Sequence, residues 1–516
     1  MSAEPAPPDQ PALSPQASRP EGDGQRAAII DLGSNSVRMV VFEGVSRNPV
    51  PIFNEKATLQ LGKGMQATGK LGEGGVEKAL DVLARFGAIA SAMGVGPFVV
   101  MATAAVRDAT NGPAFVAQAR QKLPKAHFRI LRGDEEADYS AAGVLCAVPG
   151  AVGVAADIGG GSMELIKIED GAYSHAMTTH LGVIRLSEAA EGSVEKATII
   201  ASAILAAQPW LREGAGKPLY LVGGAFRALA RAEIARTRYP LNMVHLFTLS
   251  PRQALDLTAW CQSKSVKELE KTKGVPRKRA AQLPFAAVVL EQLLKQVRPS
   301  EVVFSADGLR EGWYMRDVVP STVRAENPMD ALAQEMAQRL GRNAALAPAL
   351  VRWTAPLFSP DETEPQKRWR ALACAFSDIG SYDHPQYRAA QAYQRILVSH
   401  GVGFQHPARA FLALAVAVRY EMDPDDPTLK PSRKILSKAD FTRAVLLGQA
   451  LRLAYTLCAG TEELLARYPL KVEGPTLSLD LKADGMRMEA SVVKRRLAKL
   501  AASAGLEGVI KGEGMA

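Results

Sequence analysis

Cysteine is scarce in this chain of 516 residues, which has only Cys146, Cys261, Cys374 and Cys458. These four lie far apart and form no Cys-x-x-Cys pair, so we expect neither a disulfide framework nor a structural zinc site. Such sparse cysteine usage is typical of a reducing compartment. We therefore expect a cytoplasmic protein.

Long apolar runs are also lacking. No stretch of about 18 uncharged apolar residues occurs, so the sequence predicts no membrane span. The first residues do not show the basic-then-apolar pattern of a signal peptide. The seven histidines are dispersed and form no His-x-x-x-His pair, which argues against a zinc site on a helix.

The chain has a modest excess of basic residues, with 62 Lys and Arg against 53 Asp and Glu and a formal net charge of +9. An excess of this size favours an anionic partner. From Ser321 onward 26 basic residues accompany 21 acidic ones, a balance too even for a nucleic-acid-binding domain. We expect neither a nucleic acid nor a membrane as partner.

The texture of the sequence divides the chain into five parts. Residues 1–25 contain six prolines and no aromatic residue, which predicts a disordered tail. From residue 26 short apolar runs alternate with helical patterns, as expected for an α/β fold. We expect strands at 27–30, 37–42, 98–101, 128–131, 152–156, 165–168, 219–222 and 302–304, with helices at 75–93 and 114–123 among them.

After residue 319 the pattern becomes mostly helical, rich in Ala, Leu, Arg and Gln. We expect a loop at 421–434, a hairpin at 476–491 around Asp484-Gly485, and a basic helix at 492–502. The predicted organisation is a tail (1–25), two lobes (26–150 and 151–319), a helical domain (320–470) and a C-terminal hairpin with a basic helix (471–516).

Two segments look like copies of one unit, each a strand, a tight glycine turn and a second strand. Both contain Asp-x-Gly-x-x-Ser, and aligning them pairs Asp31 with Asp157, Gly33 with Gly159, and Ser36 with Ser162. Either copy alone is compatible with an ordinary hairpin. Two copies, 126 positions apart, favour a functional role.

The residue types in these turns suit phosphate. Glycines let backbone N–H groups approach an anion, and Ser and Asn side chains add donors. An aspartate at the end of each strand suits Mg²⁺, which prefers oxygen ligands. Arg38 stands where the second copy has Glu164, so one copy favours phosphate binding and the other a metal or a water molecule.

These turns resemble the phosphate loops of the actin, sugar kinase and Hsp70 superfamily. Within it, Asp-Leu-Gly-Ser-Asn-Ser-Val-Arg from Asp31 and Asp-Ile-Gly-Gly-Gly-Ser-Met-Glu from Asp157 resemble the exopolyphosphatase and guanosine pentaphosphate phosphohydrolase family. Further segments match that family in order, at 103–111, 133–137, 181–188, 223–224 and 308–312. The resemblance covers roughly 27–312 and is weaker beyond.

The resemblance implies two actin-like (ribonuclease H-like) lobes followed by a mostly helical domain that resembles a degenerate HD domain. It also implies site residues. Glu136, the second glutamate of Gly133-Asp-Glu-Glu-Ala, would be the catalytic base, and Glu135 would be structural. Asp157, Glu164 and Asp31 would hold the metal. The phosphate would be bound by Gly33, Ser34, Asn35, Ser36, Arg38, Thr103, Arg107, Gly159, Gly160, Gly161 and Ser162.

The activity implied is release of terminal orthophosphate from inorganic polyphosphate, with Mg²⁺ as cofactor and water as nucleophile. The resemblance leaves open a monovalent cation such as K⁺, and it implies a homodimer. The main alternative is hydrolysis of guanosine pentaphosphate (pppGpp). A superfamily kinase would need a complete adenosine site, and a non-catalytic sensor of polyphosphate or an alarmone would have no need of Glu136.

Two features concern the C-terminal third. Related metal-dependent phosphohydrolases carry a His-Asp signature, but here Ser377-Asp378, which we expect within a helix, has serine in place of the histidine. We expect helical packing there rather than a second metal site. Lys494, Arg495, Arg496 and Lys499 form a basic cluster, which is either a solvated helix face or a track for a long polyanion.

Overall fold

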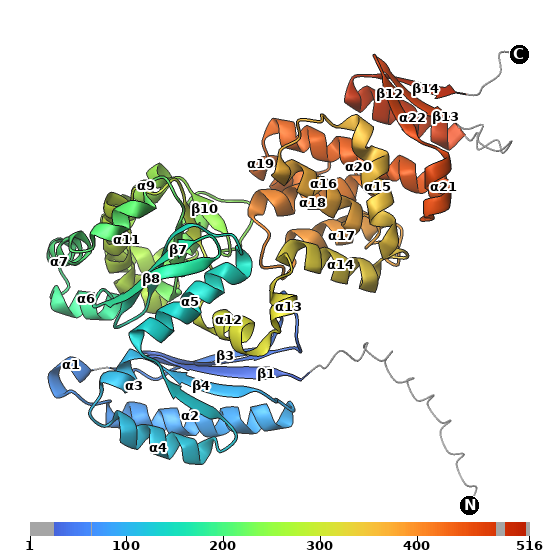
Figure 1. Ribbon diagram of the computed structural model, residues 1–516. Coiled ribbons are helices and arrows are strands. Elements are labelled where there is room, and N and C mark those ends of the chain that lie inside the picture. The colour runs from blue at the N-terminus through green and yellow to red at the C-terminus, as the bar shows by residue number, and fades with distance from the viewer. Residues whose placement is uncertain (1–24, 63, 481–490, 512–516) are drawn as a thin grey trace, which may run out of the picture.

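The computed structural model describes residues 25–480, except residue 63, and residues 491–511. Two α/β lobes stand one above the other, and a helical domain extends to one side of the upper lobe (Figure 1). Residues 1–24 of the predicted tail and the Asp484-Gly485 turn lie outside the described residues. No helix in the described ranges is long and apolar enough to cross a membrane.

The first lobe is built on a five-stranded sheet with the order β3-β2-β1-β4-β5. β1 pairs antiparallel with β2 and parallel with β4. Helices cover the sheet, and the apolar face of α2 packs through Leu83 and Phe86. The elements are β1 (Ala27–Leu32), β2 (Ser36–Phe42), β3 (Pro51–Thr58), α1 (Met65–Thr68), α2 (Glu73–Ala92), β4 (Phe98–Ala102), α3 (Ala104–Asp108), α4 (Gly112–Lys122) and β5 (His127–Ile130).

The second lobe repeats this arrangement. Its sheet has the order β10-β11-β9-β6-β7-β8, and β6 pairs antiparallel with β7 and parallel with β9. Its elements are β6 (Gly153–Ile158), β7 (Met163–Glu169), β8 (Ala172–Thr179), α6 (Val183–Ala189), α7 (Val194–Ala206), β9 (Leu219–Val222), α8 (Gly224–Arg236), β10 (Phe247–Leu249), α9 (Pro251–Gln262), α10 (Val266–Lys271), α11 (Leu283–Val297) and β11 (Val302–Phe304). The shared strand order confirms that the sequence repeat reflects a structural one.

Two helices lie between the sheets, α5 (Gly133–Ala147) and α12 (Leu309–Trp313), and their backbones touch (Figure 1). A Cβ atom on Gly312 would lie 1.8 Å from the carbonyl oxygen of Tyr139, and one on Gly143 would lie 2.3 Å from that of Gly308. Only glycine permits this approach, which explains why the segment 308–312 is glycine-rich.

The eight predicted strands are present, each within a few residues of its expected bounds, and the two predicted helices correspond to α2 and α4. Within the two lobes, β3, β8 and β10 were not predicted. β3 and β8 are edge strands with mostly exposed or half-buried residues, so they lack the apolar runs that marked the others. β10 has only three residues, too few for a pattern.

The C-terminal domain is mostly helical around one large apolar core. α13 (Ser321–Arg324) leads into it, and its main helices are α14 (Pro328–Leu340), α15 (Ala347–Thr354), α16 (Glu364–Phe376), α17 (Arg388–Leu397), α18 (His406–Arg419), α19 (Lys430–Ile435), α20 (Lys438–Cys458), α21 (Glu462–Arg467) and α22 (Ser491–Ala504). α22 corresponds to the predicted basic helix. The loop predicted at 421–434 is wrong in its second half, where α19 begins with Pro431 in its first turn, a position that proline tolerates.

Of two other expectations about this part, the hairpin is not tested and the placement of Ser377-Asp378 within a helix was wrong. β13 (Thr476–Asp480) pairs antiparallel with β12 (Leu470–Glu473) around Gly474, which has a positive φ of 59°. The turn and second strand of the hairpin predicted at 476–491 lie outside the described residues, so that hairpin stays a prediction. β13 also pairs parallel with β14 (Glu507–Lys511). Ser377 lies at the C-cap of α16 rather than within a helix, so Asp378 falls in the following turn.

Candidate active site

The two glycine turns have the same backbone geometry. In the first, the N–H of Gly33 donates to the carbonyl oxygen of Ser36 at 3.1 Å, and in the second Gly159 donates to Ser162 at 2.9 Å. The turns face each other across the gap between the lobes, since a Cβ atom on Gly160 would lie 2.8 Å from Ser34 Oγ. The structure therefore brings the two predicted phosphate loops together.

Each turn is held from behind by the next segment of its lobe. The carbonyl oxygen of Asn35 accepts from Leu59 and Gln60, and that of Gly160 accepts from Ile184 and Arg185. Gly182 packs directly on the second turn, where an added Cβ would lie 2.4 Å from Gly161. The 181–188 segment thus supports the second loop.

Because these carbonyl oxygens are engaged, the turns can present N–H groups to an anion. Among the described residues no backbone carbonyl accepts from the N–H groups of Ser34, Asn35, Gly160 or Gly161. A row of such donors in a glycine turn forms an anion-binding concavity.

A cavity of about 180 Å³ lies between the turns. Its lining includes most of the predicted site: Asp31, Gly33, Ser34, Asn35, Ser36, Arg38, Thr103, Glu136, Asp157, Gly159, Gly160, Gly161 and Ser162. Of the predicted residues of the two lobes, Arg107 and Glu164 do not line it. The basic cluster on α22 also does not line it.

The cavity is also lined by four basic residues that were not predicted as site residues: Lys56, Arg227, Arg279 and Arg310. Strand register places Asp31, Arg38 and Lys56 side by side on β1, β2 and β3. Only Arg310 lay in a motif that could have marked it, the segment 308–312. The other three are brought to the cavity by the fold.

These basic groups repel one another. Burial, Arg279 and Arg38 lower the pKa of Lys56 to about 8. Burial, with a contribution from Arg310, lowers the pKa of Arg227 to about 10. Concentrated positive charge beside unpartnered N–H groups suits an anion that carries several negative charges.

Glu136 lies in the first turn of α5, and its side chain is 14% exposed. Burial, together with the nearby charge of Asp157, raises the pKa of Glu136 to about 8. Its Oε2 atom has no hydrogen-bond partner, although Arg107 Nη1 lies 3.7 Å away. A poorly solvated carboxylate facing a polar cavity suits a general base.

The neighbours of Glu136 have positioning contacts. Glu135 accepts from the backbone N–H of Arg132 at 2.9 Å and so caps α5, in keeping with a structural role. Arg107 donates to the carbonyl oxygen of Leu131 at 2.9 Å and faces Glu136 rather than the cavity. The clamp role predicted for Arg107 stays a prediction.

The predicted metal residues form an adjacent carboxylate group. Register pairs Asp157 on β6 with Glu164 on β7, and Ser140 donates to Asp157 at 2.5 Å. Burial and the negative charge of Glu136 raise the pKa of Glu164, whose Oε1 atom has no hydrogen-bond partner. Unpartnered carboxylate oxygens that repel one another fit a divalent cation.

No group of three or more acidic, histidine or cysteine residues in the described ranges is placed to hold a metal ion alone. A Mg²⁺ ion here would need water and phosphate oxygens to complete its coordination, as this ion commonly does.

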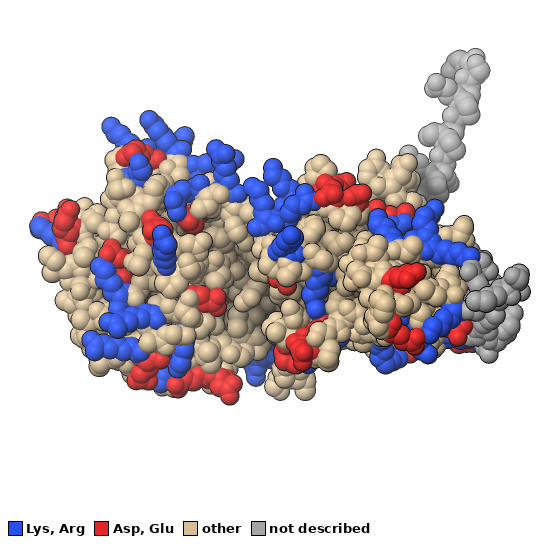
Figure 2. All heavy atoms as spheres, turned by 90° about the horizontal axis from the view of Figure 1, so that it is seen from above, with Lys and Arg blue, Asp and Glu red and all other residues tan. Residues whose placement is uncertain are grey.

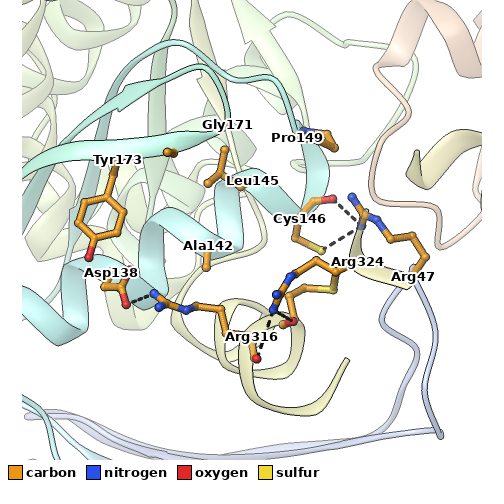
Figure 3. Close-up of a pocket in the computed structure, with 12 residues that line it drawn as sticks. Arg47, Asp138, Ala142, Leu145, Cys146, Pro149, Gly171, Tyr173, Arg316 and Arg324 are labelled. Carbon is orange, nitrogen blue, oxygen red and sulfur yellow. Dashed lines mark hydrogen bonds and ion pairs between the residues drawn. The ribbon is translucent and has the colours of Figure 1, made fainter. Parts of the chain in front are cut away.

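A larger cavity, of about 420 Å³, lies on the opposite face of α5 (Figure 3). Asp138 points into it and pairs with Arg316, while Arg47 donates to the carbonyl oxygen of Cys146 at 2.9 Å. Positions 136 and 138 lie about 200° apart around a helix, which separates the two cavities. None of the predicted site residues lines this second cavity.

The chain is similar to known proteins over both its α/β and its helical parts. The model of the Ppx/GppA phosphatase family matches residues 40–320, and a model described as "Exopolyphosphatase, C-terminal" matches residues 330–509. Exopolyphosphatase 1 of Mycobacterium tuberculosis is 27% identical over 303 residues, covering 56% of this chain and 88% of its own. Exopolyphosphatase 1 of Mycobacterium leprae is 27% identical over 335 residues, covering 62% of this chain and 97% of its own.

Solved structures show the same lobes. The crystal structure of an exopolyphosphatase from Cytophaga hutchinsonii has a TM-score of 0.52 and 25% identity, covering 57% of this chain and 99% of its own. A Ppx/GppA family member from Aquifex aeolicus has a TM-score of 0.50 and 22% identity, covering 57% and 97%. The second match shows the fold alone.

Proposed function

The chain belongs to the Ppx/GppA phosphatase family and is a hydrolase, and on that premise we propose that it releases terminal orthophosphate from inorganic polyphosphate by Mg²⁺-dependent attack of water. The observation that carries the proposal is the pair of facing glycine turns, with a half-buried glutamate and five basic side chains around one small cavity. The relatives named exopolyphosphatase support the choice of substrate.

The terminal phosphate would be bound by neutral and charged donors together. The N–H groups of the two turns and the Ser34 and Ser36 hydroxyls would contact its oxygens. Arg38 and Arg310 would neutralise its charge, and Arg suits this because its planar guanidinium donates two hydrogen bonds at once. Phosphoryl transfer depends mainly on such positioning and charge neutralisation.

Glu136 would accept the proton of the attacking water. At neutral pH its raised pKa keeps it largely protonated in the free protein, so it must lose a proton before it can act as a base. Arg107 favours the ionised form from 3.7 Å away. The pKa of Glu136 is therefore close to neutral pH, as expected of a general base.

Carboxylate oxygens from among Asp157, Glu164 and Asp31 would contribute to holding the cation, with water and phosphate oxygens completing its coordination. When bound, Mg²⁺ would neutralise charge on the phosphate oxygens. Ser140 orients the Asp157 carboxylate, and Gly223 packs against its other oxygen, where an added Cβ would lie 2.9 Å from Oδ1. These contacts fix the carboxylate at the end of β6.

The test offers long polyphosphate, tripolyphosphate and guanosine pentaphosphate side by side with Mg²⁺ and without any acceptor, and measures released orthophosphate. We expect release from polyphosphate. Release only from guanosine pentaphosphate would replace the proposed substrate. Absence of release from all three would contradict the proposal and return the kinase and the sensor to consideration.

A further inference from the structure

The C-terminal domain contains a second concentration of positive charge, apart from the inter-lobe cavity. A cavity of about 390 Å³ there is lined by five arginines drawn from separate segments of the chain. They are Arg342 after α14, Arg388 at the start of α17, Arg419 at the end of α18, Arg452 in α20 and Arg496 in α22. This cavity shares no lining residue with the inter-lobe cavity.

Two carboxylates offset only part of this charge. Asp378 lies 2.8 Å from Arg342 Nη2 and 3.4 Å from Arg419 Nη2. Glu421 lies 2.7 Å from Arg496 Nη2 and also pairs with Arg452. Within the described ranges Arg388 has no carboxylate partner, so five guanidinium groups face two carboxylates and leave three positive charges in excess.

Several donors in this cluster lack acceptors. The Nε atoms of Arg388, Arg419, Arg452 and Arg496 are buried and have no hydrogen-bond partner in the described structure. Buried N–H groups without an acceptor are costly and uncommon in folded proteins. The guanidinium groups that carry them line one cavity and form a cationic wall, which suits a ligand rich in acceptor oxygens.

The walls of the cavity are preorganised. The Arg419 guanidinium lies 4.0 Å from the ring centroid of Tyr420 and 4.1 Å from that of Tyr455. Gly380 N–H donates to the Tyr420 hydroxyl at 2.9 Å, and the Tyr455 hydroxyl lies 3.0 Å from Ser377 Oγ. Both rings are thus anchored, and they hold Arg419 in one orientation.

We propose that this cavity binds a small ligand carrying a chain of two or more phosphate groups, at a site distinct from the inter-lobe cavity. A single orthophosphate presents too few oxygens and too little charge to engage donors from five segments. A diphosphate or triphosphate at neutral pH matches the excess of three positive charges, and the volume accommodates it. The shared chemistry is the phosphate chain, whether inorganic or part of a nucleotide.

The arginine cluster also explains what the Asp378 carboxylate contacts. In related metal-dependent phosphohydrolases the His-Asp signature binds a metal, but here the aspartate accepts from the backbone N–H and the guanidinium of Arg342. Its carboxylate orients arginines instead. The cavity beside it is consequently suited to an anion.

The test measures hydrogen exchange of the full-length protein in EDTA, so that hydrolysis is prevented, with tripolyphosphate, adenosine diphosphate or orthophosphate added. Two regions are followed separately, the cavity segments 384–388, 419–421 and 449–458, and the inter-lobe turns 33–36 and 159–162. We expect tripolyphosphate to protect the cavity segments. The inter-lobe turns report on the proposed function independently.

Arg388→Gln is the first variant, because removing an unpaired arginine leaves no carboxylate without a partner. We expect the ligand concentration for half-maximal protection of the cavity segments to rise about tenfold or more, as charge-assisted hydrogen bonds are lost. Arg452→Gln, which leaves Glu421 paired with Arg496, should act in the same direction. The control is Arg339→Gln, an exposed arginine of α14 paired with Glu335 outside the cavity.

The pattern of protection decides whether the cavity binds a phosphate chain and which ligand supplies it. Protection by tripolyphosphate and adenosine diphosphate alike supports recognition of the phosphate chain itself. Protection by adenosine diphosphate alone supports the site with a nucleotide as its ligand. The proposal is overturned if the cavity segments stay unprotected, if orthophosphate protects them as well as the longer chains do, or if Arg388→Gln and Arg452→Gln bind like the Arg339→Gln control.

Discussion

At the scale of single residues, the site depends on carboxylates whose environment opposes their ionisation. Glu136, Asp157 and Glu164 are crowded near one another, and burial raises the pKa of each. A cluster of three carboxylates does not stabilise the fold, because ionised carboxylates near one another repel. Their clustering is the pattern expected of a reacting centre.

Glu136→Gln should lower kcat by about 10² to 10⁴, the usual range for loss of a general base, while polyphosphate binding changes little. Steady-state phosphate release measures the first quantity, and equilibrium binding measures the second. Glu135→Gln is the matched control, because Glu135 caps α5 and should affect stability more than rate. A Glu136→Gln protein that keeps more than a tenth of the wild-type kcat would exclude Glu136 as the base.

The dependence of kcat/KM on pH should form a bell near pH 8. The acid limb comes from Glu136, which must be ionised to act and has its pKa raised to about 8. The basic limb comes from Lys56, whose pKa is lowered to about 8 and which loses its positive charge as pH rises. Because kcat/KM reports the free enzyme, both limbs should appear in it.

Lys56→Arg separates the two limbs. Arginine stays charged throughout this range, so the basic limb should move to higher pH while the acid limb stays in place. Rate profiles between pH 6 and about 10 would measure the shift. If the variant and the wild type lose activity at the same alkaline pH, Lys56 does not set that limb.

Asp157→Asn should raise the Mg²⁺ concentration required for half-maximal rate, because an amide oxygen is a weaker ligand than a carboxylate. The substitution keeps the shape of the side chain and the contact with Ser140. A Mg²⁺ titration measures the midpoint, with Asp134→Asn as a control on the exposed side of α5. Equal midpoints for Asp157→Asn and the wild type would show that Asp157 is not a ligand.

At the scale of elements, helix α5 connects the site to the rest of the protein. One face presents Glu136 to the inter-lobe cavity, and another packs against α12, which carries Arg310 to the same cavity. Gly133 at the start of α5 lies so close to β8 that an added Cβ would lie 2.2 Å from Thr178 Oγ1. Glu136, the proposed base, and Arg310 are therefore positioned by close contacts of glycines in α5 and α12.

Gly312→Ala should destabilise this contact, because the new Cβ would overlap the backbone of α5. Overpacking of this kind costs roughly 1–3 kcal/mol, so we expect a lower thermal midpoint and reduced activity as Arg310 shifts. Gly74→Ala is the control, since its Cβ would meet nothing within 4 Å on α2. Calorimetry of both variants measures the difference, and equal midpoints would show that the contact tolerates a methyl group.

At the scale of the whole molecule, basic residues are spread over both α/β and helical parts. Figure 2 shows Lys and Arg interspersed with Asp and Glu over the face it displays, without one continuous basic stripe. In the predicted track Arg495 and Lys499 are exposed, whereas Arg496 is half-buried and paired with Glu421. A long polyanion would thus meet only part of that cluster.

Replacing Arg495 and Lys499 with Gln should reduce processivity on long polyphosphate more than hydrolysis of short chains, if the track contributes. Each lost phosphate contact should also make binding less sensitive to salt. Gel-resolved products at low and high salt would show intermediate lengths in the variant. Products that match the wild type at both salt concentrations would remove α22 from the track and leave it a solvated helix face.

The sequence by itself determined the fold class, the repeated strand-turn-strand unit and most of the residues around the inter-lobe cavity. It did so because each glycine turn and its strand-end aspartate are local: Asp31 and Ser36, or Asp157 and Ser162, lie within one hairpin, whose conformation depends on neighbouring residues. Family resemblance added the expectation that Glu136 is the base, whereas the local pattern alone favoured only an acid that complements the helix dipole.

Only the tertiary structure decided which distant side chains join the two glycine turns at the inter-lobe cavity. Lys56 lies on an edge strand without an apolar pattern, and Arg227 and Arg279 come from separate segments, so nothing local marks them as neighbours of Arg38. The arginine cavity of the C-terminal domain is a stronger case, because its five arginines are spread over 155 positions from Arg342 to Arg496 and meet only through helix packing. Periodicity reports which face of an element is buried, whereas long-range packing sets which faces meet.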